Sequence, residues 1–326
     1  MFALSNFIAS LLLSLADTTM ITLALQAMAT RFELVLNGDS PSLRAAGEEA
    51  LAEISRIESM LSLYKPSSEV ANINARSGEE PVRVSAEMFA LLDRAVALSR
   101  ETNGAFDITI APLVRCWGFM RGQGSIPSDS DIDEALANVG SHLLVLNFPH
   151  RTVQFSRPGM MLDFGAFGKG YAVDRAIEIL RDYEITSALL HGGTSTVLGI
   201  GRAENNVPWR IAVTGEPPSE EVLWLVDLSE TSLSVSAVWG KSFASQGRTF
   251  GHILDARTGR PSERAELAAV NVPSAADSDA LSTALLVEGV AGLSTLASHR
   301  PASRGLVFAN GNISKHNIDE RAAAPH

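Results

Sequence analysis

Residues 210–236 read RIAVTGEPPSEEVLWLVDLSETSLSVS, and this stretch decides the fold class. It holds three apolar segments, at residues 210–214, 222–228 and 233–236, which are short and rich in the residues that strands prefer. Polar and turn-forming residues separate them, so these strands follow one another without a helix in between. Strands in direct succession favour an α+β fold with mixed, largely antiparallel sheets and packed helices over a doubly wound parallel sheet.

The rest of the chain supplies further strands and the helices that pack on them. Strands are predicted at residues 30–36, 187–190, 252–255, 267–272 and 306–309. Helices are predicted at residues 41–62, 88–96 and 275–287, and from Gly170 onward. The helix over 88–96 is the best defined, because Ser85 is placed to cap its start and Gly104 follows its end.

Composition and charge exclude several classes of protein. The 326 residues are 46% hydrophobic and 19% charged, which is typical of a globular protein with a large core. Lys and Arg number 26 against 37 Asp and Glu, so the formal net charge is −11 and no basic field attracts a nucleic acid. The sequence has one Cys and seven scattered His, so any metal is expected to be bound by oxygen ligands.

The chain has no internal repeat and no long linker, so a single domain is expected. We expect a weakly specified extension at residues 1–19, the domain at residues 20–309 and a polar tail at residues 310–326. Residues 8–15 form a short apolar run, but the first thirty residues contain neither Lys, Arg nor Cys. The basic region of a secretory signal and a cysteine for lipid attachment are both missing, so a cytoplasmic location is expected.

Residues 161–172, MLDFGAFGKGYA, run through three glycines and a lysine into a predicted helix. Glycines let the backbone approach a phosphate, a helix start offers free N–H groups, and Lys169 adds a positive charge. The spacing is neither that of a P-loop nor that of a dinucleotide-binding fingerprint. The segment is therefore either an anion site or a glycine-rich turn whose lysine lies in solvent.

Residues 274–285, SAADSDALSTAL, place Asp279 and Thr283 one turn apart on a predicted helix. A carboxylate above a hydroxyl can give two oxygens to a magnesium ion, which completes its shell with phosphate or water. The alternative is that Thr283 bonds back to a helix carbonyl and that Asp279 only favours the helix N-terminus.

Three further residues carry chemistry that could serve a ligand. His252 lies in residues 251–261, GHILDARTGRP, and is either a ligand contact or proton-transfer group or a satisfied core histidine. The turn that follows it, residues 255–258, could be bonded only to itself. Tyr64 either stacks on a planar ring or packs in its loop. Asp107 lies among apolar residues, where an acid needs a partner or a ligand.

Taken in order, these segments resemble the FAD:protein FMN transferase family, also called the ApbE family, from about Leu25 to Gly289. The matching segments are Met28–Thr30, Ser62–Asn74, Gly104–Phe119, Leu162–Asp174, His252–Pro261 and Asp279–Ala284. The family patterns that they resemble include Met-Gly-Thr, Leu-Asp-x-Gly with Lys-Gly-Tyr-Ala-x-Asp, His-Ile-x-Asp-x-Arg-Thr-Gly-x-Pro and Asp-Ala-Leu-x-Thr-Ala.

The resemblance implies an ApbE-like fold and a transferase that binds FAD and magnesium. Such an enzyme moves FMN from FAD to a threonine hydroxyl of an acceptor protein, a protein flavinylation, and releases AMP. Family acceptors include subunits of membrane redox complexes and soluble flavin-carrying reductase domains. The implied metal ligands are the Ala166 carbonyl, Asp279 and Thr283. Asp279 is also the residue expected to be essential for turnover. The implied contacts to FAD are Met28, Tyr64, Lys65, Pro66, Asp107 and Lys169, and His252 is the candidate for positioning or deprotonating the threonine.

The chain departs from the family pattern at four positions. Ala29 and Ala237 stand where Gly is usual, Thr194 where Asn is common and Ala256 where Pro is frequent. None of these changes removes an implied metal ligand or Lys169, so the activity is still expected, with Ala29 and Ala237 able to tighten the flavin pocket.

Two other functions remain open from the residues. A magnesium-dependent FAD pyrophosphatase, in which water replaces the threonine and FMN and AMP are the products, would need the same groups. A non-catalytic flavin-binding protein is the other alternative, and Asp279 and Thr283 argue against it because binding alone does not require a metal pair.

Overall fold

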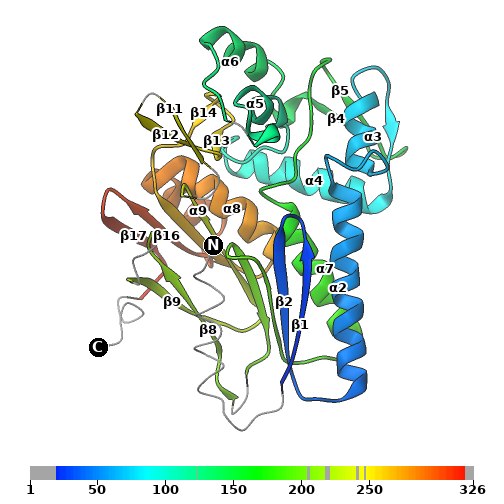
Figure 1. The fold of residues 1–326 in the computed structure, drawn as a ribbon, viewed down its shortest axis with the longest axis vertical. Helices are drawn as coiled ribbons and strands as arrows, with labels where there is room; N and C mark the ends of the chain where they lie inside the picture. The colour runs from blue at the N-terminus through cyan, green and yellow to red at the C-terminus, as the bar shows by residue number, and fades with distance from the viewer. Residues whose placement is uncertain are drawn as a thin grey trace.

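The computed structural model describes residues 20–122, 124–203, 206–216, 221–239, 242–245 and 247–319. Its centre is an eight-stranded sheet, and the strands described in it pair antiparallel throughout (Figure 1). In spatial order these strands are β1 (Met20–Ala27), β2 (Thr30–Asn37), β6 (Ala188–Gly192), β7 (Thr196–Ile200), β10 (Thr231–Ala237), β15 (Leu267–Val272), β16 (Arg304–Ala309) and β17 (Asn312–His316). The predicted α+β class with largely antiparallel sheets is confirmed.

One face of the main sheet is covered by helices that pack against one another (Figure 1). These are α2 (Pro41–Leu61), α7 (Gly168–Asp182) and α8 (Ala275–Glu288), and α8 is followed by the short turn η4 (Gly289–Ala291) and by α9 (Gly292–His299). The largest apolar core lies between these helices and the sheet, and Phe32, Ile54 and Val173 in it are completely buried. Each Å² of apolar surface removed from water stabilises the folded state by about 25 cal/mol, so this layer is the main source of the protein's stability.

The other face of the sheet is covered by a two-stranded hairpin. Its strands are β8 (Trp209–Thr214) and β9 (Val222–Leu228), which follow each other as the sequence predicts. Trp209 and Trp224 from this hairpin pack with Leu189 from the main sheet into a second core. The two cores lie on opposite faces of one sheet, so successive residues of the central strands are buried on alternate sides.

The remaining elements form a cap beyond one end of the main sheet, in the upper part of Figure 1. Its helices are α3 (Glu69–Arg76), α4 (Ala86–Glu101), α5 (Ala111–Cys116) and α6 (Asp129–Leu136), with the short turns η1 (Phe119–Arg121) and η2 (Ser141–Leu143). Its strands are β3 (Val82–Arg83), β4 (Leu144–Asn147), β5 (Thr152–Phe155), β11 (Ser242–Ser245), β12 (Arg248–Gly251), β13 (Leu254–Asp255) and β14 (Arg260–Pro261).

The antiparallel register brings several connections to the same end of the main sheet. Phe32 pairs with Gly192, and Gly192 pairs with Thr196, so the β1–β2 turn and the β6–β7 turn lie at one end. Thr196 pairs with Ser234, which puts the end of β10 beside them. This end of the sheet is where the candidate site is assembled.

The helices that the sequence predicts are confirmed, and α4 extends beyond the predicted residues 88–96 at both ends. Ser85 caps α4, because its Oγ accepts a hydrogen bond from Met88 N at 3.1 Å. Helix α7 begins at Gly168, before Gly170 where the sequence placed its start. Strand β17 extends the sheet past the predicted domain end at residue 309. As an edge strand it has a single apolar residue, Ile313, so its sequence shows no apolar alternation that would predict a strand. The predicted extension at residues 1–19 lies outside the described residues.

Within the described part of the chain, one helical stretch is long and apolar enough to cross a membrane. It is Ala275–His299, in which an 18-residue window has a mean hydropathy of 1.5 and is 56% buried inside the protein. A helix that is enclosed on most sides in a globular fold has the same apolar composition.

Candidate functional site

The glycine-rich segment forms a tight turn that opens directly into α7. The backbone N–H groups of Phe167 and Gly168 donate to the Phe164 carbonyl at 3.0 and 2.6 Å. Helix α7 has no side-chain cap at its N-terminus. The first helical bond runs from Tyr171 N to the Phe167 carbonyl, which leaves the Ala166 carbonyl outside the helix ladder. An uncapped helix start with a free carbonyl next to it can serve both an anion and a cation.

Asp279 of α8 meets this helix start, 109 residues away in the chain from Gly170. Gly170 N donates to Asp279 Oδ2 at 3.1 Å. Lys169 Nζ lies 3.5 Å from the same oxygen and 3.2 Å from the Gly165 carbonyl oxygen. Asp279 is 3% exposed, so its carboxylate is held by these groups rather than by solvent. The structure therefore joins the two segments that the sequence singled out separately.

Thr283 lies one turn further along α8 and adopts the back-bonded conformation that the sequence left open. Its Oγ1 donates to the Asp279 carbonyl at 3.2 Å. The same Oγ1 lies 3.2 Å from Ser236 Oγ at the end of β10, and Ser236 Oγ lies 3.0 Å from Ser282 Oγ. A hydroxyl that donates its proton to a carbonyl keeps its lone pairs available, so back-bonding does not remove Thr283 as an oxygen ligand.

With the Ala166 carbonyl that the family resemblance implies, Asp279 and Thr283 would offer a metal one carbonyl, one carboxylate and one hydroxyl oxygen. In the described residues no group of three or more His, Cys, Asp or Glu side chains is close enough to hold a metal ion. A soft or borderline metal would lack its usual ligands here. The donor set fits magnesium, which needs few protein oxygens and takes phosphate or water for the rest of its shell.

Met28 and Lys65 are linked through a residue that sequence reasoning missed. Glu58 near the end of α2 accepts from Met28 N at 2.6 Å through Oε1, and its Oε2 lies 3.2 Å from Lys65 Nζ. The Met28 N–H, followed by Lys65, lowers the pKa of the Glu58 carboxyl below its usual 4.5. Glu58 carried no signal in the sequence, because its partner is a hairpin turn 30 residues away. This link holds the loop after α2 beside the β1–β2 turn.

Tyr64 and Pro66 lie exposed beside Lys65 on this loop. Tyr64 is 74% exposed, so the alternative of a packed loop tyrosine is wrong. Ser68 Oγ anchors the loop by donating to the Ser62 carbonyl at 2.6 Å. The ring of Tyr64 is thus presented on a fixed loop, where it is accessible to a planar ligand.

Asp107 is buried and fully engaged by the protein. Its Oδ1 accepts from Thr109 N at 2.8 Å and from Thr109 Oγ1 at 2.6 Å. Its Oδ2 accepts from Ser99 Oγ at 3.0 Å and from Ser141 N at 2.7 Å. These donors fill both oxygens, so the structure gives Asp107 the role of a loop anchor, and the predicted contact with FAD finds no free carboxylate oxygen there.

The sequence predicted that His252 lies on a strand, and this is wrong. His252 lies in the bend between β12 and β13. The turn after it is bonded to itself, as one alternative had it, because Arg257 donates to both oxygens of Asp255 at 2.8 and 2.9 Å. Arg257 also reaches Glu288 at 3.2 Å, which fixes the turn against the end of α8. The structure thus holds the His252 segment next to the helix that carries Asp279 and Thr283.

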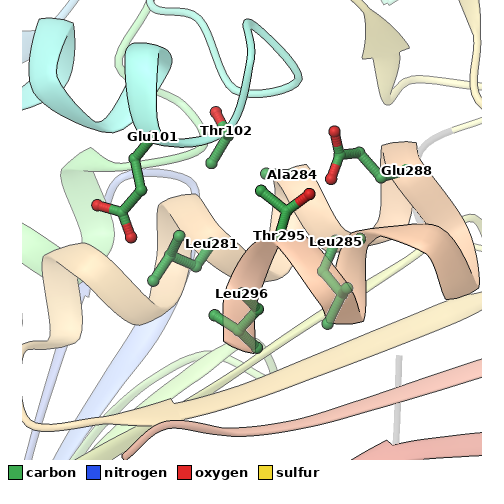
Figure 2. Close-up of a pocket in the computed structure, with 9 residues that line it drawn as sticks. Glu101, Thr102, Leu281, Ala284, Leu285, Glu288, Thr295 and Leu296 are labelled. Atoms are coloured by element: carbon green, nitrogen blue, oxygen red, sulfur yellow. The ribbon is translucent and has the colours of Figure 1, made fainter. Parts of the chain in front are cut away.

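A small pocket lies on another side of α8 (Figure 2). Its lining residues are Glu101, Thr102, Leu281, Ala284, Leu285, Glu288, Gly292, Thr295 and Leu296. Its two carboxylates are paired with arginines, Glu101 with Arg300 and Glu288 with Arg257. On the helix, Leu281, Ala284, Leu285 and Glu288 occupy the face opposite Asp279 and Thr283. This pocket is therefore separate from the candidate site.

Known proteins resemble this chain over most of its length. The model of the ApbE family matches residues 28–306. The FAD:protein FMN transferase of Treponema pallidum is 29% identical over 266 residues, which cover 76% of this chain and 72% of that protein. The FAD:protein FMN transferase of Escherichia coli K12 is 30% identical over 249 residues, covering 74% and 70%.

Solved structures agree with the sequence matches. The crystal structure of the ApbE protein of Thermotoga maritima has a TM-score of 0.85 at 27% identity, and the match covers 94% of this chain and all of that one. The apo form of the flavinyl transferase ApbE of Pseudomonas stutzeri has a TM-score of 0.81 at 27% identity, with 95% and 98% covered.

Proposed function

The chain belongs to the ApbE family and is an FAD:protein FMN transferase, and on this premise we propose the details of its reaction. It transfers FMN from FAD to a threonine hydroxyl of an acceptor protein, releases AMP and requires magnesium. The bond that forms joins the threonine oxygen to the FMN phosphorus. The bond that breaks is the phosphoanhydride between FMN and AMP, and AMP leaves with the bridging oxygen.

The observation that carries this proposal is the contact between Asp279 and the start of α7. The helix start and Lys169 favour a pyrophosphate, whereas the carboxylate of Asp279, 3.1 Å from Gly170 N, repels one. A divalent cation held by Asp279 would resolve this conflict, because it would supply the positive charge that lets a carboxylate and a pyrophosphate occupy the same site. A magnesium ion bound by Ala166, Asp279 and Thr283 would supply Lewis-acid stabilisation of the charge that develops on the pyrophosphate.

The chain's own residues bind and orient the reactants. The positive end of the α7 dipole and the ammonium of Lys169 hold the phosphates, and preorganised charges of this kind contribute most of the rate in phosphoryl transfer. Gly170 N fixes the Asp279 carboxylate at 3.1 Å. His252 takes the proton of the threonine hydroxyl as the oxygen attacks phosphorus, which is ordinary general-base work for an imidazole. Tyr64 offers its exposed ring to the flavin.

The test combines the purified chain with FAD, magnesium and a flavinylatable acceptor domain. Flavin fluorescence on a denaturing gel and the mass of the acceptor report transfer, and AMP is measured in the same reaction. We expect covalent flavin on the acceptor threonine, complete loss of label with a chelator, and no label on an acceptor whose target threonine is replaced by valine.

Two variants sharpen the test. Asp279→Asn is expected to abolish both AMP release and labelling, because it removes the charged oxygen ligand. Asp129→Asn, an exposed acid at the start of α6, is the matched control and keeps full activity. AMP release without any labelled acceptor would instead support the pyrophosphatase alternative, and bound FAD with neither product would support a flavin-binding protein.

A further inference from the structure

Helix α8 is capped by a residue from another helix. Asp174 of α7 accepts hydrogen bonds from Ser274 Oγ and Ala275 N, both at 2.7 Å, and from Ala276 N at 2.9 Å. Helix α8 already has a cap of its own, since Ser274 Oγ accepts from Asp277 N at 3.2 Å. Asp174 therefore does more than satisfy helix N–H groups: it fixes the first turn of α8 to α7.

Gly170 makes the second contact between the same two turns. A Cβ atom at Gly170 would lie 2.1 Å from the Ala275 carbonyl oxygen, so only glycine allows the helices to approach this closely. Gly170 N then reaches Asp279 Oδ2 at 3.1 Å.

The two contacts have matching spacing. Gly170 and Asp174 are one turn apart on α7, and Ala275 and Asp279 are one turn apart on α8. Asp174 accepts a hydrogen bond from Ala275 N. Gly170 lies against the Ala275 carbonyl, and its own N–H donates to Asp279. This pairing sets both the distance and the register between the start of α7 and the Asp279 carboxylate, to which the proposed function assigns the phosphates and the metal.

We propose that Asp174 is a positioning residue for Asp279, holding the start of α8 against α7 so that the Asp279 carboxylate is preorganised for a divalent cation. The link to metal binding rests on the proposed function. Supporting groups that orient a ligand typically change metal affinity about 10- to 100-fold when they are removed. Asp174 reaches Asp279 only through the backbone of α8, so its effect on the metal is indirect.

The test measures Mn²⁺ binding to the chain without FAD, by calorimetry or by the electron paramagnetic resonance of free Mn²⁺. Asp174→Ala is expected to weaken Mn²⁺ binding about 10-fold or more. Asp174→Asn is expected to lie between the wild type and Asp174→Ala, because its amide oxygen still accepts part of the hydrogen bonding. Gly170→Ala, which pushes the two helices apart, is expected to weaken Mn²⁺ binding as well.

The matched control is Asp131→Ala in the capping box of α6. The Asp131 carboxylate accepts from Ser128 N at 3.1 Å and Ser128 Oγ at 2.6 Å, so it caps a helix with the same kinds of donor at a distance from the site. This variant is expected to lower stability and to leave Mn²⁺ affinity unchanged.

The outcomes separate the inference from the function on which it rests. Unchanged Mn²⁺ affinity in Asp174→Asn and Gly170→Ala, together with a loss in Asp279→Asn, would overturn the positioning role and leave the function standing. Unchanged affinity in Asp279→Asn would overturn the metal assignment itself. If Asp174→Ala does not fold, Asp174→Asn decides the question at a temperature where thermal unfolding shows it to be native.

Discussion

Lys169 Nζ lies 3.5 Å from Asp279 Oδ2, so a lysine ammonium partly neutralises the carboxylate that is proposed to bind the metal. The lysine is 21% exposed and the aspartate side chain 5%, and the same ammonium also reaches the Gly165 carbonyl at 3.2 Å. On the proposed function, Lys169 and a divalent cation would therefore compete for the Asp279 carboxylate in the absence of FAD. With FAD bound, the phosphates would offer Lys169 a second partner and remove the competition.

Replacing Lys169 by alanine is expected to tighten Mn²⁺ binding to the FAD-free chain and to weaken FAD binding. A partly exposed charge pair is worth about 1 kcal/mol, so we expect Mn²⁺ to bind about 3- to 10-fold more tightly. Titration with Mn²⁺ and quenching of flavin fluorescence measure the two effects separately. Lys315→Ala on the edge strand is the control, and weaker Mn²⁺ binding in Lys169→Ala would contradict the competition.

Ser236 is expected to hold the hydroxyl of Thr283 in place for the metal. Because the two oxygens are 3.2 Å apart, Ser236→Ala removes one of the two contacts that orient the Thr283 hydroxyl and should raise the magnesium concentration needed for half-maximal AMP release about 10-fold. Ser232→Ala is the matched control. Ser232 is on the same strand as Ser236, and its Oγ contacts Ser278 Oγ of α8 at 2.9 Å and not Thr283. An equal magnesium requirement in both variants would remove Ser236 from the site.

The β1–β2 turn is strained by its sequence. Met28 and Ala29 have φ values of 49° and 57°, a left-handed conformation that non-glycine residues pay for with about 1 kcal/mol each. Ala29→Gly is expected to raise the free energy of unfolding by up to about 1 kcal/mol, as measured by urea denaturation.

Gly193→Ala, in the β6–β7 turn, tests the same rule in reverse. Gly193 has φ 62°, and a Cβ there would lie 2.2 Å from Thr30 Oγ1. We therefore expect a clear loss of stability in the same urea denaturation.

His191 is expected to make stability fall at acidic pH. Its Nδ1 donates to the Gly193 carbonyl at 3.1 Å, while its Nε2 is buried with no hydrogen-bond partner among the described residues. Burial lowers the pKa of His191 below its usual 6.5, so as the pH falls through 6.5 the unfolded chain takes up the proton first. This contribution to stability is present above pH 6.5 and is lost as the pH falls towards the lowered pKa.

Urea denaturation at about pH 7.5 and about pH 5.5 measures this dependence. His191→Leu is expected to reduce the difference between the two pH values, because the titrating group is gone and leucine suits the apolar surroundings of Leu189 and Val197. His150→Gln, in an exposed turn, should keep the wild-type difference. If His191→Leu shows the same difference as the wild type, another group is responsible for it.

Local patterns in the sequence determined the main elements and the class of chemistry. The apolar periodicity of α4 and its cap Ser85 fixed a helix, because both signals depend on residues a few positions apart. The strands of residues 210–236 indicated an antiparallel α+β fold for the same reason. Strand β1 gave no such signal, because its turn, Met28–Ala29, lacks the Asn-Gly or Asp-Gly typical of two-residue hairpins. Strand β17 was missed because an edge strand needs little apolar alternation.

Only the tertiary structure decided which candidate residues act together. Asp279 and Lys169 are 110 residues apart, and their contact depends on α7 and α8 packing without a side chain between them at Gly170. In the sequence Asp107 needed either a partner or a ligand, and the fold supplies partners, because donors from three segments surround its carboxylate. Sequence patterns report the preferences of neighbouring residues, whereas the electrostatics of a site depend on which distant groups the packing brings within a few ångströms.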